Sequence, residues 1–194
     1  KNKTKSIYDI DNTTNFQVYK GIETENPSST KAVQETAGII MTYNHEPILA
    51  YFHSSSGGKT IDPKYVWKGS DLPYIRGVKC NYDKESPHYN WTITLTIDEI
   101  NEAFKKKYSR MGKIKSISFK RFDGRVVEVS LTHSGGNITV TGNEFRLLFP
   151  SSKIRSTLFT SERRGNSFIL NGKGWGHGVG MSQWGARVRG EKGQ

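Results

Sequence analysis

The chain has 194 residues, 34% of them hydrophobic and 11% aromatic, and its 29 Lys and Arg against 18 Asp and Glu give a formal net charge of +11. This length allows a hydrophobic core, the composition excludes a disordered chain, and the basic surplus favours an anionic partner such as an acidic cell-wall polymer. A single cysteine, Cys80, excludes an internal disulfide and a cysteine-based zinc cluster.

The sequence shows no targeting segment and no membrane-spanning segment. No apolar run approaches the roughly 18 residues that cross a bilayer, and there is no signal peptide. The chain starts with KNKTKS and without Met. We therefore expect a segment of a longer protein, with room for a targeting or anchoring element upstream.

The first third of the chain predicts a short strand, a helix and a hairpin. Residues 17–19, QVY, are expected to form the strand. The stretch PSSTKAVQETAG predicts a helix that is capped by Ser28 or Ser29 and ends at Gly38. Two apolar runs around NHE then predict a β-hairpin, whose second strand leads into residues 54–60.

The rest of the chain predicts two capped helices and several antiparallel strands. TIDEINEAFKKKY is the clearest helix, because Thr96 and Glu99 form a capping box. Its apolar face is expected in the core: Ile97, Ile100, Phe104 and Tyr108. The alternating runs IKSISF, VVEVSLTH and NITVT predict three strands, the last two joined across SGGN. Thr141 and Glu144 cap a second helix, and STLFTSE and NSFILNG predict a final strand pair.

This order of hairpins and short helices predicts the α+β class, with a mixed, largely antiparallel β-sheet and several short helices. The sequence shows no internal repeat and no low-complexity linker. We therefore expect a single compact domain over residues 1–194.

The charged and metal-binding residue types do not form a site of their own. One basic run is interpreted as a solvated face: Lys105, Lys106, Lys107, Arg110, Lys113 and Lys115. Nucleic-acid sites interleave such charges with exposed aromatics, whereas Phe104 and Tyr108 fall on the apolar face, so we expect no nucleic-acid partner. The five histidines include no pair at metal-ligand spacing, and we expect no metal and no cofactor.

The stretch FHSSSGGKT, residues 52–60, is rich in serine and glycine after an apolar strand. A flexible turn has this composition as well. The P-loop pattern fails because it needs an earlier glycine and a following helix, and the nucleophile elbow fails because GxSxG is missing. What remains is a loop dense in hydroxyl and N–H donors, which suits a polar, uncharged ligand such as a sugar.

A second unusual stretch, GKGWGHGVGMSQWGA at residues 172–186, contains six glycines. A dinucleotide fingerprint is excluded, because only 14 residues follow Gly180 and no βαβ unit fits. The pattern predicts a strand end, a glycine-lined turn of close backbone approach and a helix that begins near residues 181–182. His177 lies inside this turn, and a structural and a functional role both stay open for it.

Both stretches resemble the SpoIID/LytB family of bacterial cell-wall proteins, the stage II sporulation protein D group. The stretches QVYKG, AVQETAGIIMTYNHEPILAYFHSSSGGKT, LPYIRGVKC, STLFT and GKGWGHGVGMSQWGA follow the family order over most of the chain. The resemblance implies a mixed α/β fold. It also implies a lytic transglycosylase that cuts peptidoglycan glycan strands stripped of their peptides by an amidase, in septal wall remodelling during engulfment.

The resemblance further implies extracytoplasmic work behind a membrane anchor that lies outside this chain, with glycan strands and a cell-wall amidase as partners. Members of the LytB type modify such an amidase, so a wall-binding module without enzyme activity is the alternative. Some members hold zinc near QVY, but DNTTNFQVY contains neither Cys nor His. The family's catalytic glutamate lies upstream of QVY in a segment that would precede Lys1, and neither Glu23 nor Glu25 has its context. The catalytic residue is therefore unknown, and this fragment is expected to bind glycan without cutting it.

The resemblance implies a glycan cleft with two walls. One wall is expected from Ser54, Ser55, Ser56, Gly57, Gly58 and Thr60, and the other from His177, Gly178, Gly180, Met181, Ser182, Gln183 and Trp184. Trp175 or Trp184 would stack on a sugar, and core packing is the alternative for Trp175. A rim is expected from Tyr82, Lys84, Ser86 and Tyr89. A weaker hypothesis is a serine hydrolase that uses Ser55 or Ser56 with His177 and Asp62.

Overall fold

The computed structural model describes Asn12 and residues 18–194. The chain divides into two compact units, Lys1–Ile48 and Leu49–Gln194, whereas we expected a single domain. Burial explains the division: no residue in 18–48 is buried, and every member of the two hydrophobic clusters lies between residues 51 and 179. Within the described part of the chain, none of the helices has both the length and the apolar character needed to cross a membrane.

The described part of the first unit contains a short 3-10 helix, an α-helix and a short hairpin. Its elements are η1 (Ile22–Thr24), α1 (Pro27–Glu35), β1 (Thr42–Tyr43) and β2 (Glu46–Pro47). The cap of α1 is Asn26, whose side chain accepts a hydrogen bond from the Ser28 N–H at 2.9 Å, so the assignment of Ser28 or Ser29 as the cap is wrong. Pro27 then occupies the first helical position, where its missing N–H has no effect. The predicted strand at 17–19 lies partly outside the described residues, and Val18 and Tyr19 are not in a strand.

The hairpin around NHE is confirmed, because β1 and β2 pair antiparallel and the turn residues Asn44 and His45 have positive φ. Its second strand ends at Pro47, which has no N–H to continue a ladder. The strand that leads into the serine-rich loop is therefore a separate one, β3 (Phe52–His53). It pairs in parallel with β10 (Met181–Ser182) from the far end of the chain.

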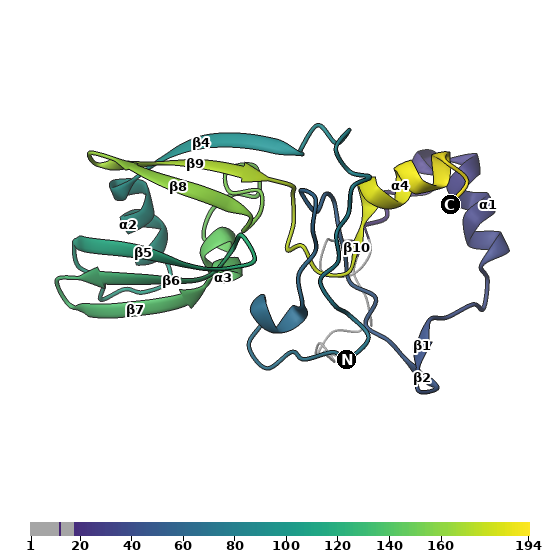
Figure 1. The fold of residues 1–194 in the computed structure, drawn as a ribbon, viewed down its shortest axis with the longest axis horizontal. Helices are drawn as coiled ribbons and strands as arrows, with labels where there is room; N and C mark the ends of the chain where they lie inside the picture. The colour runs from purple at the N-terminus through teal and green to yellow at the C-terminus, as the bar shows by residue number, and fades with distance from the viewer. Residues whose placement is uncertain (1–11, 13–17) are drawn as a thin grey trace. The chain divides into compact units, whose positions relative to one another are not determined.

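The second unit contains two antiparallel three-stranded sheets, which lie one above the other in Figure 1. The first has the order β4 (Asn90–Thr96), β9 (Ser167–Lys173) and β8 (Phe159–Arg164). The second has the order β5 (Ile114–Phe122), β6 (Arg125–His133) and β7 (Gly136–Thr141). These strands confirm the α+β class and the predicted strand pairs, while β4 was not among the expected elements.

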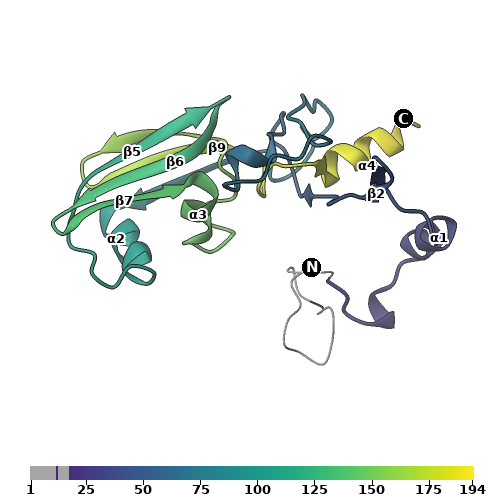
Figure 2. The same cartoon turned by 90° about the horizontal axis from the view of Figure 1, so that it is seen from below.

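Two helices begin at the predicted capping boxes and lie on the same side of the strands in Figure 2: α2 (Ile97–Lys105) and α3 (Gly142–Leu147). Thr96 accepts from the Glu99 N–H, and Thr141 accepts from the Glu144 N–H, both at 3.1 Å. Fully buried side chains from α2, α3 and both sheets form the larger core: Ile100, Phe104, Phe145, Leu95, Val129 and Leu170.

A smaller core lies where the two unusual stretches meet. It consists of Ile61, Val66, Ile75 and Val179, and the short helix η2 (Pro63–Tyr65) packs beside it. Helix α4 (Gln183–Glu191) starts after β10, close to the predicted position, with Ser182 as its cap.

Candidate functional site

The serine-rich loop and the glycine-rich stretch lie side by side, joined by backbone hydrogen bonds. Beside the β3–β10 pair, the Met181 N–H donates to the Tyr51 carbonyl and the Trp184 N–H donates to the Ser54 carbonyl, both at 3.0 Å. Ser55 and Trp175 exchange two more bonds, at 3.0 and 2.8 Å. The two stretches were expected to face each other as two walls across a cleft, but these bonds join them directly.

The glycines of the second stretch allow this close approach. Gly178 has φ +78°, and a Cβ there would lie 2.5 Å from the guanidinium carbon of Arg125. Gly176 has φ +113°, and its Cβ would lie 2.7 Å from the Cβ of His53. Both positions combine a left-handed backbone with a steric conflict, so only glycine fits them. The glycine density is thus explained by contacts within the protein.

Asp83 is the acceptor that ties the two stretches together. It is fully buried, and its Oδ2 accepts from the Ser55 hydroxyl at 3.1 Å, the Ser56 N–H at 2.5 Å and the Ser56 hydroxyl at 2.7 Å. The Gly57 N–H at 3.1 Å and the Ser182 hydroxyl at 3.2 Å complete the set. The hydroxyls of these three serines were expected to face a glycan, but the structure turns them inward onto this carboxylate.

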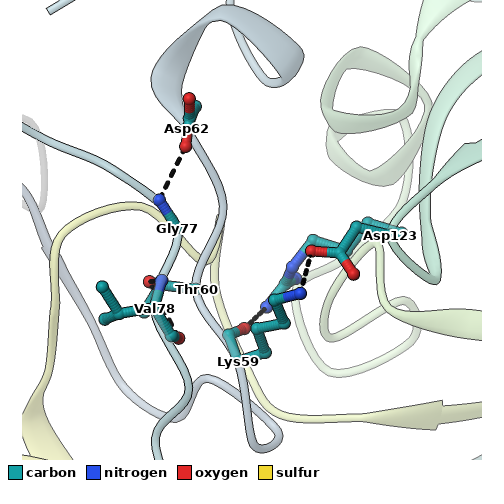
Figure 3. A network of polar contacts seen from close by, with 7 residues as sticks. Lys59, Thr60, Asp62, Gly77, Val78 and Asp123 are labelled. Carbon is teal, nitrogen blue, oxygen red and sulfur yellow. Dashed lines mark hydrogen bonds and ion pairs between the residues drawn. The ribbon is translucent and has the colours of Figure 1, made fainter. Parts of the chain in front are cut away.

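Arg125 is a second buried charged residue that holds the serine-rich loop. Its guanidinium Nη2 donates to the carbonyls of Ser56 and Lys59, both at 2.7 Å, and the residue is 2% exposed. Burial lowers the pKa of Arg125 to about 10, so it stays charged at neutral pH. Figure 3 shows Lys59 next to Asp123, with which it forms an ion pair. Neither Asp83 nor Arg125 was a candidate from sequence, because each lies outside the two recognisable stretches.

The far end of the loop is anchored by backbone and side-chain bonds (Figure 3). The Thr60 hydroxyl accepts from the Val78 N–H at 2.8 Å, and an Asp62 oxygen accepts from the Gly77 N–H at 2.6 Å. Asp62 therefore serves a loop contact. The catalytic triad considered from sequence is not formed, because both candidate serines donate to Asp83 and the Nδ1 of His177 accepts from the Val179 N–H at 3.1 Å.

The imidazoles of His53, which is buried, and His177, which is half-buried, lie with ring centroids 5.6 Å apart. The Nδ1–H of His53 donates to the Val179 carbonyl at 3.0 Å, while its Nε2 is buried without a partner. Burial lowers the pKa of both groups to about 4, with repulsion from His177 as the second cause at His53 and from Arg146 at His177. Both imidazoles are therefore neutral at neutral pH, which favours a packing role for His177 over acid catalysis.

Two hollows on this surface are lined by the remaining predicted residues. The smaller, of about 140 Å³, is lined by Ser54, Gln183, Trp184 and Arg187. The larger, of about 410 Å³, includes Thr60, Gly180, Met181 and Ser182 together with the rim residue Tyr82.

The other predicted residues lie around these hollows or beneath the surface. Gly57 is buried against Lys173, whereas Gly58 is half-buried and faces the Tyr89 hydroxyl. Trp175 is half-buried, with the His88 ring edge-on at 4.4 Å and the Arg155 guanidinium 5.3 Å from its centroid. Of the other rim residues, Ser86 is buried and Lys84 is exposed. Glycan binding by this set stays a prediction.

A metal centre has no support in the part of the chain that the structure describes. There, no group of three or more His, Cys, Asp and Glu side chains gathers closely enough to hold an ion. The described residues therefore provide no donor set for a catalytic or structural metal.

Comparison with family models identifies two parts of the chain. Residues 1–43 match the model described as stage II sporulation protein, and residues 77–180 match a domain of unknown function, DUF8618. The first match ends before the serine-rich loop, and the second ends inside the glycine-rich stretch.

Individual relatives align with nearly the whole chain. Stage II sporulation protein D of Bacillus subtilis is 33% identical over 95% of this chain and 55% of its own length. An uncharacterized protein of Brachyspira hyodysenteriae is 36% identical over 96% of this chain and 50% of its own length. The amidase enhancer of Bacillus subtilis is 29% identical over 98% of this chain and 33% of its own length. The chain thus spans about half the length of the first two relatives. Together with the family-model match, these similarities show that the chain belongs to the SpoIID family.

Proposed function

We propose that the protein containing this chain remodels the bacterial cell wall in sporulation by binding and cleaving peptidoglycan glycan strands. The observation that carries the proposal is the joining of the two family stretches by the β3–β10 pair and by Asp83. Side chains that line the smaller hollow suit a sugar polymer. Gln183 is exposed, Ser54 and Trp184 are half-buried, and the Trp184 ring lies 5.1 Å from the Arg187 guanidinium.

The proposed reaction is that of a lytic transglycosylase on peptide-stripped glycan. One acid protonates the glycosidic oxygen and then, as its conjugate base, takes the proton from the sugar's 6-hydroxyl, which attacks the anomeric carbon and leaves a 1,6-anhydro end. Asp83, the carboxyl group that joins the two stretches, is not suited to this step, because it is fully buried and accepts from five donors. We assign the acid to the glutamate that the family carries upstream of QVY, and binding to the present chain.

The proposal includes an extracytoplasmic location, since the substrate lies outside the cell membrane, and a membrane anchor as in the family. The formal net charge of +11 is consistent with work on an anionic wall. Protease treatment of intact protoplasts tests the location: degradation of the protein supports it, and full protection contradicts it.

Cleavage is tested with the full-length protein and purified peptide-free glycan strands. Mass spectrometry of the products should show 1,6-anhydro ends, and a Glu→Gln variant at the upstream family position should abolish them. If the wild-type protein releases no anhydro ends, or if its products carry reducing ends instead, the transglycosylase proposal is refuted.

A second candidate function is suggested by the similarity of this chain to an amidase enhancer. In this alternative the protein binds the wall and stimulates a partner amidase without cutting glycan. The test measures amidase turnover on whole peptidoglycan with and without the full-length protein. A rise in turnover without new glycan ends supports the alternative, and unchanged turnover excludes it.

A further inference from the structure

The larger hollow has two cationic side chains in its lining, and the one buried carboxylate that contacts the lining, Asp83, accepts from Ser182 behind it. Lys79 from the loop before Cys80 and Arg189 from α4 both line it, and both are exposed. Among the residues that the structure describes, no Asp or Glu side chain lines this hollow, and neither cation has a carboxylate within ion-pair distance. Because neither cation forms an ion pair within the protein, both can bind an anionic group of a ligand.

The lining also contains apolar and aromatic side chains, beside the polar residues Thr60, Ser182 and Gln194. Val78 and Met181 line the hollow with exposed fractions of 58% and 52%. The Arg189 guanidinium lies 5.6 Å from the centroid of the Tyr82 ring, so this ring holds the cation beside the apolar surface. The hollow therefore suits a ligand in which a small apolar group adjoins a carboxylate.

We propose that this hollow binds the lactyl carboxylate of N-acetylmuramic acid, with Lys79 and Arg189 as the residues that recognise it. The inference rests on the proposed glycan-binding function and deepens it. When a stem peptide is removed, the lactyl ether keeps a methyl group and gains a free carboxylate, and these match the apolar lining and the two cations. While the peptide is attached, the same carbonyl belongs to a neutral amide, so the hollow selects peptide-free strands.

The size of the hollow agrees with this assignment. Its volume of about 410 Å³ lies within the roughly 300–1,000 Å³ typical of small-ligand sites. It also lies directly beside the family stretch, because Gly180 and Met181 form part of its lining. A glycan strand that contacts this stretch can therefore place one lactyl group in the hollow.

The experiment compares two tetrasaccharides of equal length by titration calorimetry with the full-length protein. One alternates N-acetylglucosamine with peptide-free N-acetylmuramic acid, and the other contains N-acetylglucosamine alone. The variant is Lys79→Gln with Arg189→Gln. The control is Lys105→Gln with Arg164→Gln, which removes the same charge from exposed positions that pair with Glu102 and Glu162. Mass spectrometry after each titration verifies that the sugars are intact.

The wild-type protein and the control should bind the muramic acid tetrasaccharide more tightly, by about fivefold, the size expected for two partly exposed ion pairs. The hollow variant should bind both sugars equally, at the affinity of the uncharged one. Added salt should shrink the wild-type preference, because it screens exposed charges.

Four results overturn the inference. Equal wild-type affinities, or a preference that survives in the hollow variant, contradict it and leave the proposed glycan binding intact. Tighter binding of a glycerol phosphate oligomer than of the muramic acid tetrasaccharide assigns the cations to a different polymer. Binding of neither tetrasaccharide refutes the proposed function together with the inference.

Discussion

Replacing Asp83 with Ala should destabilise the protein more than any exposed substitution in the same loop. The change removes the acceptor of two buried backbone N–H groups, Ser56 and Gly57, and of three serine hydroxyls. The hydroxyls can rotate toward other acceptors, but the two N–H groups cannot. At about 1–3 kcal/mol for each unsatisfied buried donor, the expected loss is about 2–6 kcal/mol. A domain of ordinary stability has only about 5–15 kcal/mol to lose.

Urea unfolding followed by tryptophan fluorescence measures this loss, with Glu85→Ala as the control because Glu85 is exposed in the same loop. Asp83→Asn keeps one acceptor oxygen and should lie between the wild type and Asp83→Ala. Amide hydrogen exchange provides a local measurement, since the Ser56 and Gly57 amides should exchange faster in the alanine variant. The reasoning is refuted if Asp83→Ala unfolds within about 0.5 kcal/mol of Glu85→Ala with unchanged exchange at these two amides.

Three further predictions concern the histidine pair, a glycine and a helix cap. The pKa values of His53 and His177 are about 4 in the folded protein, against an ordinary value of 6.5 for histidine. The stability that these neutral imidazoles contribute should be fully present above pH 6.5 and should fall as the pH drops toward 4, by up to about 3 kcal/mol per histidine. Urea midpoints measured across this pH range check the prediction, and a flat profile contradicts it. Gly178→Ala should cost about 2 kcal/mol or more, because it adds strain at φ +78° and a clash with Arg125. Gly190→Ala in α4, with open space around it, should instead be neutral or stabilising. Thermal melts of the two glycine variants measure both effects. Thr96→Ala should lower the free energy of unfolding by about 1 kcal/mol through loss of the α2 cap, and an unchanged urea midpoint would count against the capping box.

Local signals in the sequence predicted the helices and hairpins of the second unit well. Both capping boxes join residues only three apart, and β6 and β7 are joined across a turn that the stretch SGGN already indicated. Such contacts close within one turn of chain, so the residue types alone are informative. The α1 cap was misassigned because Ser28 and Ser29 compete with Asn26 by the same chemistry, and the position of Pro27 decides between them.

The candidate site depended on the same local patterns only in part. The glycine pattern predicted close backbone approach, and Gly178 and Gly176 show it. The sequence also predicted which stretches belong together, since both carry family motifs. The prediction that the serine hydroxyls face a ligand was wrong, however, because no nearby residue in the sequence indicates that Asp83 is their acceptor.

The sequence by itself determined the basic charge, the fold class and the membership in the SpoIID family, because these depend on composition, short-range patterns and motif order. Only the tertiary structure decided how the site is built. The bonds from Ser56 to Asp83, from Arg125 to Ser56 and from His53 to Val179 join residues 27, 69 and 126 positions apart. A buried carboxylate or guanidinium takes whichever donors and acceptors the packed core brings to it. The partners of such a buried group depend on the whole fold, and they cannot be predicted from the residues next to it in the sequence.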